Sequence, residues 1–250
     1  MERFGGCARS TCALQPDGPG EYNHRPMNGD WRVWQLIDSA FPTGGFAHAG
    51  GLEAAWQVRV VCDVETLIAF AQASLTQTAR SAGPFVRAVH AEPSRFAELD
   101  AVQEAMLSNH VANRASRAQG RALLSSAGQI FDDATAQAIL QPASSTSARL
   151  KLPVHVAGAF GLVARAIAVP ADAVASMFLF AALRGLTSSA VRLGIVGPME
   201  AQSLQARLAD GAGRLALACS ADPDDTVQTS PMLDLIQGSQ DRLYSRLFQS

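Results

Sequence analysis

The sequence predicts an all-helical fold, and three observations support this. Hydrophobic residues make up 48% of the 250 residues, with alanine and leucine abundant among them, whereas aromatic residues make up only 6%. Strong helix formers dominate and runs of β-branched residues are scarce. Apolar residues also repeat at helical spacing in one segment after another. We therefore expect a single-domain helical bundle over residues 30–222, preceded by a disordered extension at 1–29 and followed by a linker and a docking tail at 223–250.

The charge balance argues against two classes of protein. The net charge of −2 is not that of a general nucleic-acid binder or of a polybasic membrane binder. Lys151 is the only lysine, so lysine-dependent chemistry is confined to that position. The longest uncharged apolar stretch, residues 173–183, is shorter than the ~20 residues that span a bilayer. We expect neither a nucleic-acid partner nor a membrane partner.

The four cysteines have no paired or zinc-like spacing. Cys7 and Cys12 fall in the expected extension, while Cys62 and Cys219 lie among apolar residues and are expected to be buried thiols. This usage fits a reducing compartment, and the N-terminus lacks the apolar core of a signal peptide. These features predict a soluble, cytoplasmic protein.

The first predicted unit is a helix, a glycine-rich loop and a second helix within residues 31–57. The apolar face of the first helix consists of Trp31, Trp34, Leu36 and Ile37. Pro42 should end this helix, because proline lacks a backbone donor and disfavours helix in the residue before it. Two glycine pairs, Gly44–Gly45 and Gly50–Gly51, allow a tight loop before the second helix begins at Leu52. One interpretation is that this unit does no more than join two core helices.

Three helices are expected over the next stretch. Asp63 should cap the first, whose apolar stripe is Val64, Leu67, Ile68, Ala71 and Leu75. A short helix over residues 85–90 follows Gly83–Pro84. Ser94 should cap a further helix, whose inner face is Phe96, Leu99, Val102 and Met106.

Residues 109–124 predict a helix with one basic face. Arg114, Arg117 and Arg121 recur at three- and four-residue spacing. One interpretation is a solvated face of the helix. The other is a docking stripe for an acidic partner surface, because arginine favours bidentate contacts with carboxylates.

The third quarter of the chain predicts further helices. Residues 131–141 form one with Asp132 and Asp133 near its N-terminal end, and residues 142–147 read as a serine-rich loop. Apolar helices follow over 152–170 and 172–193, the second either continuous or broken near Gly185. His155 has no partner at a ligand-like spacing, so we expect a hydrogen-bonded core histidine rather than a metal ligand.

The last quarter predicts a helix and a docking tail. Pro198 suits the first position of a helix over 199–209, which Gly211 and Gly213 weaken or end. Residues 222–229 form a polar, acidic linker, and residues 230–248 are rich in leucine, isoleucine, tyrosine and phenylalanine. A chain end of this composition should dock, either onto its own domain or onto a partner.

No linear motif of a metalloprotease, serine hydrolase, P-loop or dinucleotide-binding site is present. His48 and Glu53 in the first unit could act as acid and base. A small helical enzyme that uses these two residues is therefore one alternative, and a generic helical adaptor is another.

Several stretches resemble the UreF family of urease accessory proteins. Residues 38–53 resemble its N-terminal signature, approximately DSxxPxGxFxHSxGLE, with Ala49 in place of the usual serine. Residues 230–248 resemble its C-terminal signature, with Gln240 where histidine is common. Similar runs in the family match three further stretches, which are residues 116–124, 155–165 and 184–202.

This resemblance implies a non-enzymatic protein of urease maturation and nitrogen metabolism. It implies an all-helical, homodimeric scaffold that bridges a UreD/UreH-type accessory protein and the GTPase UreG, and that modulates the GTPase. The complex would load nickel into apo-urease, with no nickel or cofactor stably bound to this chain. The resemblance also implies a set of partner-binding residues, namely Tyr244, Arg246, Leu247, Phe248, Arg242, Arg117, Arg121, Arg192, His48 and Glu53.

Overall fold

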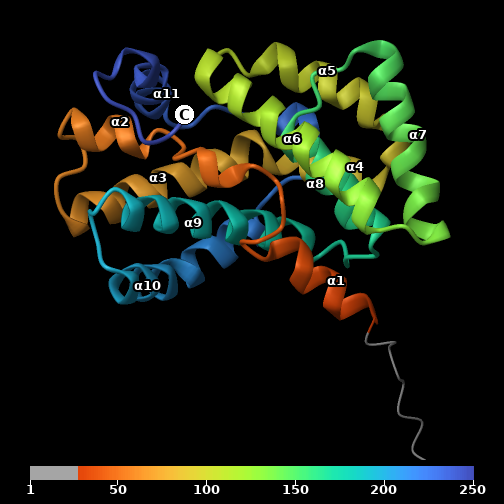
Figure 1. Cartoon of the computed structure of the whole chain (residues 1–250), viewed down its shortest axis with the longest axis horizontal. Coiled ribbons are helices and arrows are strands. Elements are labelled where there is room, and N and C mark those ends of the chain that lie inside the picture. Colours follow the sequence, from red (N-terminus) through yellow and green to blue (C-terminus); the bar gives the residue numbers. More distant parts are fainter. Residues whose placement is uncertain (1–27) are drawn as a thin grey trace, which may run out of the picture.

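The computed structural model describes residues 28–250, which fold into α-helices joined by loops and short 3-10 turns, with no strand among them (Figure 1). The predicted all-helical fold is confirmed for this part of the chain. Most of the expected disordered extension, residues 1–27, lies outside the described residues. Its last two residues begin the first helix, α1 (Asn28–Ile37).

The centre of the larger core is α8 (Val156–Ala166), in which all residues except Val156 and Arg165 are buried. It packs against α4 (Gly83–Ala91), α6 (His110–Ile130) and α7 (Ala134–Leu150). Gly161 allows the close approach of α4, because a Cβ atom at this position would collide with the carbonyl oxygen of Val86. α5 (Phe96–Met106) covers the same core from the side of α4 and α8.

A second layer is formed by α3 (Val64–Ser81), α9 (Val174–Arg192) and α10 (Pro198–Leu217), which pack against one another (Figure 1). Asp63 caps α3 as predicted, since its carboxylate accepts from the backbone N–H of Thr66. The short helices α2 (Leu52–Gln57) and α11 (Pro231–Gly238) contact each other at the end of the molecule where the C-terminus also lies.

By length and composition, α9 could also cross a membrane, although the stretch predicted to be its apolar core is shorter. Core helices of soluble proteins share this property. Half of the relevant window is buried within the protein, where α9 packs against α3, α4 and α10. In this fold α9 is therefore a core helix.

Two predicted helix boundaries are wrong, and the open question of a break near Gly185 is answered. Residues 142–147 are not a loop, because α7 continues through Pro142 to Leu150. α9 is continuous through Gly185, and α10 continues through Gly211 and Gly213 to Leu217. Each helix buries side chains on both sides of these positions. This packing outweighs the cost inside a helix of a glycine, ~1 kcal/mol, or of a proline, ~3 kcal/mol.

Predictions of burial also needed correction. Trp31 and Trp34 do not form a buried face, since they are 70% and 65% exposed. The thiol of Cys62 is exposed, whereas that of Cys219 is buried as predicted. Cys7 and Cys12 lie outside the described residues.

The inner face of α5 is also different from the prediction. Ser94 lies in a 3-10 turn and does not cap the helix. Val102 and Met106 are partly exposed, and Asp100 and Gln103 are buried in their place. The face is rotated because Asp100 turns inward to accept hydrogen bonds from the backbone N–H groups of residues 154 and 155, at 2.8 and 2.6 Å.

The contact between α4 and α8 predicts that Gly161→Ala destabilises the fold. The added methyl group must displace the backbone of Val86, so the free energy of unfolding should fall by about 1–3 kcal/mol in urea denaturation. The matched control is Gly185→Ala, which places a methyl group in open space on α9 and should be neutral or stabilising by up to ~1 kcal/mol. Equal effects of the two substitutions would contradict this account of the core.

Candidate functional site

The tail, which we define as residues 230–250, folds back onto the glycine-rich loop near the start of the described chain. Its first part is α11, and its last part runs beside the loop that precedes α2. The buried residues of the tail are Gln240, Ser250, Phe248 and Ile236. Residues 38–53 and 230–248 are therefore in contact. About 190 residues of sequence separate Glu53 from its bonding partners Gln240 and Leu247.

The carboxylate of Glu53 holds the tail. It accepts hydrogen bonds from the backbone N–H groups of Leu247 and Phe248, at 2.6 and 3.0 Å, and from Nε2 of Gln240 at 2.7 Å. Glu53 is only 2% exposed and lies in the first turn of α2. Gly51, with a φ of 86°, supplies the left-handed backbone from which this helix starts. A buried carboxylate needs such donors, because burying a charge without hydrogen bonds is costly.

Arg192, the last residue of α9, contacts both the glycine-rich loop and the tail. Its guanidinium group lies 3.8 Å from the ring centroid of Phe46 and 4.2 Å from that of Phe248. It also donates a hydrogen bond to the carbonyl oxygen of Phe46. The cation therefore lies against one ring from the loop and one ring from the tail, a favourable arrangement for arginine.

His48 also contacts the tail. Its Nδ1 atom lies 2.6 Å from Oγ of Ser250, and the backbone of residues 47 and 49 pairs with that of residues 249 and 250. Burial, and next the positive charge of Arg114, lower the pKa of His48. We call His48, Glu53 and Arg192 the tail seat.

Next to the tail seat, α6 carries the basic face predicted from the sequence. Arg114 binds Asp241 of the tail through two bonds of 2.8 and 3.0 Å, and Arg246 contacts the same carboxylate at 3.1 Å. The hydrogen bond from Arg114 is the main cause that lowers the pKa of Asp241. Arg117 and Arg121 lie farther along α6 and line a hollow of about 550 Å³ between α5 and α6, which we call the arginine hollow.

A buried hydrogen-bond chain lies beside the arginine hollow. Nε2 of His155 lies 2.8 Å from the Glu104 carboxylate, and Nδ1 lies 3.1 Å from Oγ of Ser116. His155 is fully buried, which confirms the prediction of a core histidine. Although hydrolases use the order carboxylate–histidine–serine, Oγ of Ser116 accepts from the backbone N–H of Val156 and does not line the hollow. This hydrogen-bond chain therefore stabilises the N-terminus of α8.

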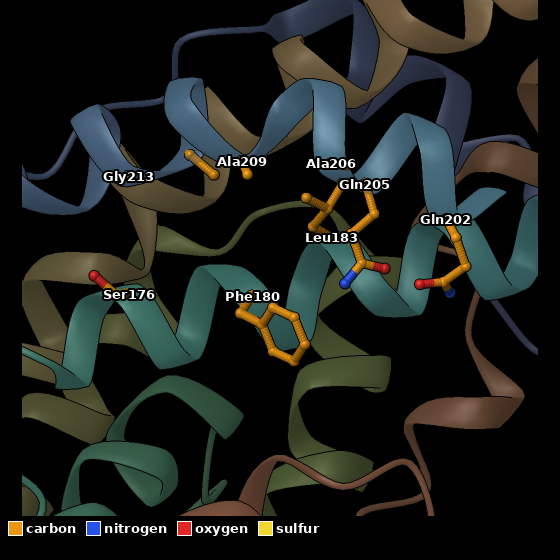
Figure 2. A pocket seen from close by; sticks show the side chains of 9 residues that line it. Ser176, Phe180, Leu183, Gln202, Gln205, Ala206, Ala209 and Gly213 are labelled. Atoms are coloured by element: carbon orange, nitrogen blue, oxygen red, sulfur yellow. The ribbon is translucent and has the colours of Figure 1, made fainter. Parts of the chain in front are cut away.

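A second depression, of about 400 Å³, lies between α9 and α10 (Figure 2). Phe180 and Leu183 reach into it from α9, and Ala206 and Ala209 from α10, with Gln202 and Gln205 at one end. No ionisable side chain lines this depression, so it offers no acid–base group. Among residues 28–250, no group of three or more His, Cys, Asp or Glu side chains is placed to hold a metal ion.

The structure brings together some of the site residues predicted from the sequence. His48, Glu53, Arg192 and Phe248 are in mutual contact through the tail, which Leu247 joins through its backbone. Others face solvent, and these are Arg242, Tyr244, Arg246 and the side chain of Leu247. Arg117 and Arg121 belong to the arginine hollow and not to the tail seat.

The sequence did not predict the site contacts of four residues. Phe46 matched a family motif but had no assigned contact, and Arg114 was part of the basic stripe without a partner. Asp241 pairs with Arg114 across 127 residues, a distance at which no sequence spacing gives a signal. Gln240 was noted only as a departure from the family pattern, and it donates to Glu53 from a fully buried position.

Comparisons with known proteins agree on one family. The UreF family model matches residues 61–209. The chain is 38% identical over 223 residues to "Urease accessory protein F" of Arabidopsis thaliana, covering 88% of this chain and 92% of that protein. It is 37% identical over 222 residues to the protein of the same name from Oryza sativa subsp. japonica, covering 87% and 84%. It is 31% identical over 217 residues to "Urease accessory protein UreF" of Paenarthrobacter aurescens, covering 86% and 96%.

The tail seat predicts that Glu53→Gln loosens the tail. The amide lacks the charge and one acceptor oxygen, and hydrogen bonds to a charged group contribute about 1.5–3 kcal/mol. Trypsin should therefore cleave after Arg242 and Arg246 about tenfold faster than in the unmodified protein. Glu98→Gln, at an exposed position on α5, is the matched control and should not change the rate. Cleavage at the unmodified rate in Glu53→Gln would show that this carboxylate does not hold the tail.

Gln240→His should leave the tail docked. A ring N–H of the histidine can replace the amide donor to Glu53. The substitution also removes the amide oxygen of Gln240, which has no partner among the described residues. We expect tryptic cleavage at the unmodified rate or slower. Gln240→Leu, which cannot donate, should be cleaved as fast as Glu53→Gln.

The buried histidines predict that stability decreases in mild acid. Burial is the main cause that lowers the pKa values of His48, His90 and His155. The unfolded chain therefore binds protons more readily than the folded chain, so the free energy of unfolding falls as the pH drops below the ordinary histidine value of about 6.5. Each group can contribute at most about 1.4 kcal/mol per pH unit.

Urea denaturation at about pH 7.5, 6.5 and 5.5 measures this dependence above the range near 4 in which carboxylates titrate. His155→Gln should reduce the slope. A free energy of unfolding that is constant or rises toward pH 5.5 would contradict the assignment.

Proposed function

Because the chain belongs to the UreF family of urease accessory proteins, we propose that it is a scaffold of urease maturation that bridges a UreD/UreH-type accessory protein and the GTPase UreG. The assembled complex inserts nickel into apo-urease, and the scaffold modulates the GTPase. The chain acts in the cytoplasm as a homodimer, and the complex rather than this chain handles the nickel. UreF proteins are not known as catalytic enzymes.

The observation that carries this proposal is the surface of the docked tail. The Tyr244 side chain is fully exposed and Leu247 is 54% exposed, while the backbone N–H of Leu247 is bonded to Glu53. Met232 and Leu235 on α11 are 65% and 69% exposed. Exposed tyrosine and leucine on a held backbone, with Arg246 beside them, are the kind of anchors that dominate protein interfaces. We assign this surface to the UreD/UreH-type partner.

The environment of His48 and Glu53 supports a scaffold rather than an acid–base enzyme. The Glu53 carboxylate accepts three hydrogen bonds from the tail, and His48 contacts Ser250. Both groups therefore already serve to position the tail. An acid–base pair would need access to a substrate, and neither residue lines either of the two depressions described above.

The test is co-expression with a UreD/UreH-type protein and UreG from the same organism, followed by size-exclusion chromatography. We expect Tyr244→Ala/Leu247→Ala to weaken the complex at least about tenfold without changing the thermal midpoint, because both side chains point away from the body. Met199→Ala/Leu217→Ala is the matched control, since both of these side chains are about 80% exposed on α10.

Each outcome has a distinct meaning. A complex that forms with the control but not with the tail variant supports the scaffold and the tail surface. A tail variant that binds as well as the unmodified chain contradicts the assigned surface and leaves the scaffold in place. If the unmodified chain co-elutes with neither partner in the presence of GTP and nickel, the proposed function is wrong.

A further inference from the structure

Asp241 of the tail pairs with Arg114 and His110 at one side of the arginine hollow, whereas Arg117 and Arg121 make no contact with the tail. We propose that this hollow binds an acidic segment of a protein partner, in which two carboxylates on neighbouring residues or turns contact Arg117 and Arg121. This inference depends on the geometry of α5 and α6 alone. It can be tested without any urease component, so it can fail while the proposed function stands.

The negative charges near the hollow are already compensated. Glu104 is the one carboxylate among the lining residues, and it accepts from Asn113 at 3.0 Å and lies 2.8 Å from His155. Although partial burial opposes it, these hydrogen bonds and the nearby positive charges lower the pKa of Glu104, so the group is ionised at neutral pH. At the rim, Asp241 is bound by Arg114 and Arg246.

The positive charges of Arg117 and Arg121 are not matched in the same way. Arg117 reaches Glu104 at 3.4 Å and shares that carboxylate with two other groups. Arg121 donates to the carbonyl oxygen of Pro153 at 3.1 Å and forms no ion pair within residues 28–250. Each guanidinium group therefore keeps several N–H donors free. Two such cations next to a polar hollow attract negative charge.

The spacing of the two arginines fits carboxylates of a peptide. They are four residues apart on α6, so their side chains lie on adjacent turns about 6 Å apart. Arginine binds carboxylates through two parallel N–H donors, which gives both strength and orientation. A hollow of about 550 Å³ is large enough for several side chains, and Leu107 in its lining can contact an apolar residue beside the acidic ones.

The floor of the hollow is rigid. Gly120, between the two arginines, lies against the backbone of Val154, where a Cβ atom would collide with the carbonyl oxygen. Ser116 holds the first turn of α8 from the same face of α6. Because α6 cannot shift here without breaking these contacts, little ordering cost is expected when a ligand binds.

Two features favour a protein segment over a nucleic acid or a free phosphate. The basic surface is short and belongs to a chain with a net charge of −2, whereas nucleic-acid binding relies on an extended basic surface. The ionised Glu104 repels a compact multiply charged anion placed between the arginines. An extended segment can instead place one carboxylate on each arginine and an apolar residue near Leu107.

The experiment measures fluorescence anisotropy of a labelled peptide, Gly-Glu-Glu-Leu-Glu-Glu-Gly, with the full chain at about 50 mM salt. We expect saturable binding that Arg117→Gln/Arg121→Gln weakens at least tenfold. Arg207→Gln/Arg214→Gln is the matched control, because it removes the same charge from exposed positions on α10 and should change the affinity less than twofold. Arg121→Lys keeps the charge but loses the bidentate geometry, and it should weaken binding at least threefold in a folded protein.

The remaining outcomes overturn the proposal. Absence of peptide binding would do so, as would equal losses in the two double variants, which would indicate only long-range attraction to net charge. A competition series decides the ligand class. If tripolyphosphate or a single-stranded oligonucleotide displaces the labelled peptide at a lower concentration than the unlabelled peptide does, the hollow is a phosphate site and not a peptide site.

Discussion

The buried carboxylate of Glu53 is the interaction on which the candidate site depends. One charged group in the first turn of α2 accepts hydrogen bonds from two backbone amides and one side chain of the tail. A carboxylate that is 2% exposed is tolerable only with these donors, so the seat and the tail require each other. Arg192 adds a cation between Phe46 and Phe248, which ties the end of α9 to the same junction.

This junction explains why residues at opposite ends of the chain act as one unit. Gly51 sets the direction of α2, Leu52 anchors it in the core with no exposed surface, and Glu53 then faces the tail. In return, the tail closes this end of the molecule and exposes Tyr244 and Leu247 at defined positions. A surface presented on a held backbone loses less conformational entropy on binding than a free chain end would. The scaffold role proposed for this UreF family member depends on that difference.

Much of the fold was predictable because local patterns decide it. The Asp63 cap of α3, the start of α10 at Pro198 and the core position of His155 all followed from short-range chemistry. Pro142 was misread because packing on both sides of it outweighs its local effect. Trp31 was misread because helical spacing identifies a face but does not say what covers it. The site was less predictable, since the bond between Arg114 and Asp241 spans 127 residues and leaves no trace in sequence spacing.

Amide hydrogen exchange of the tail in the isolated chain tests the central claim most directly. If Glu53 holds the tail, the N–H groups of Leu247 and Phe248 should exchange at least about tenfold more slowly than that of Tyr244. The first two are bonded to the Glu53 carboxylate, and a free-energy difference of ~1.4 kcal/mol corresponds to a tenfold change in rate. Exchange of all three amides at the rate of an unstructured peptide would contradict the account, since it would mean that the tail is not docked on Glu53 in the free protein.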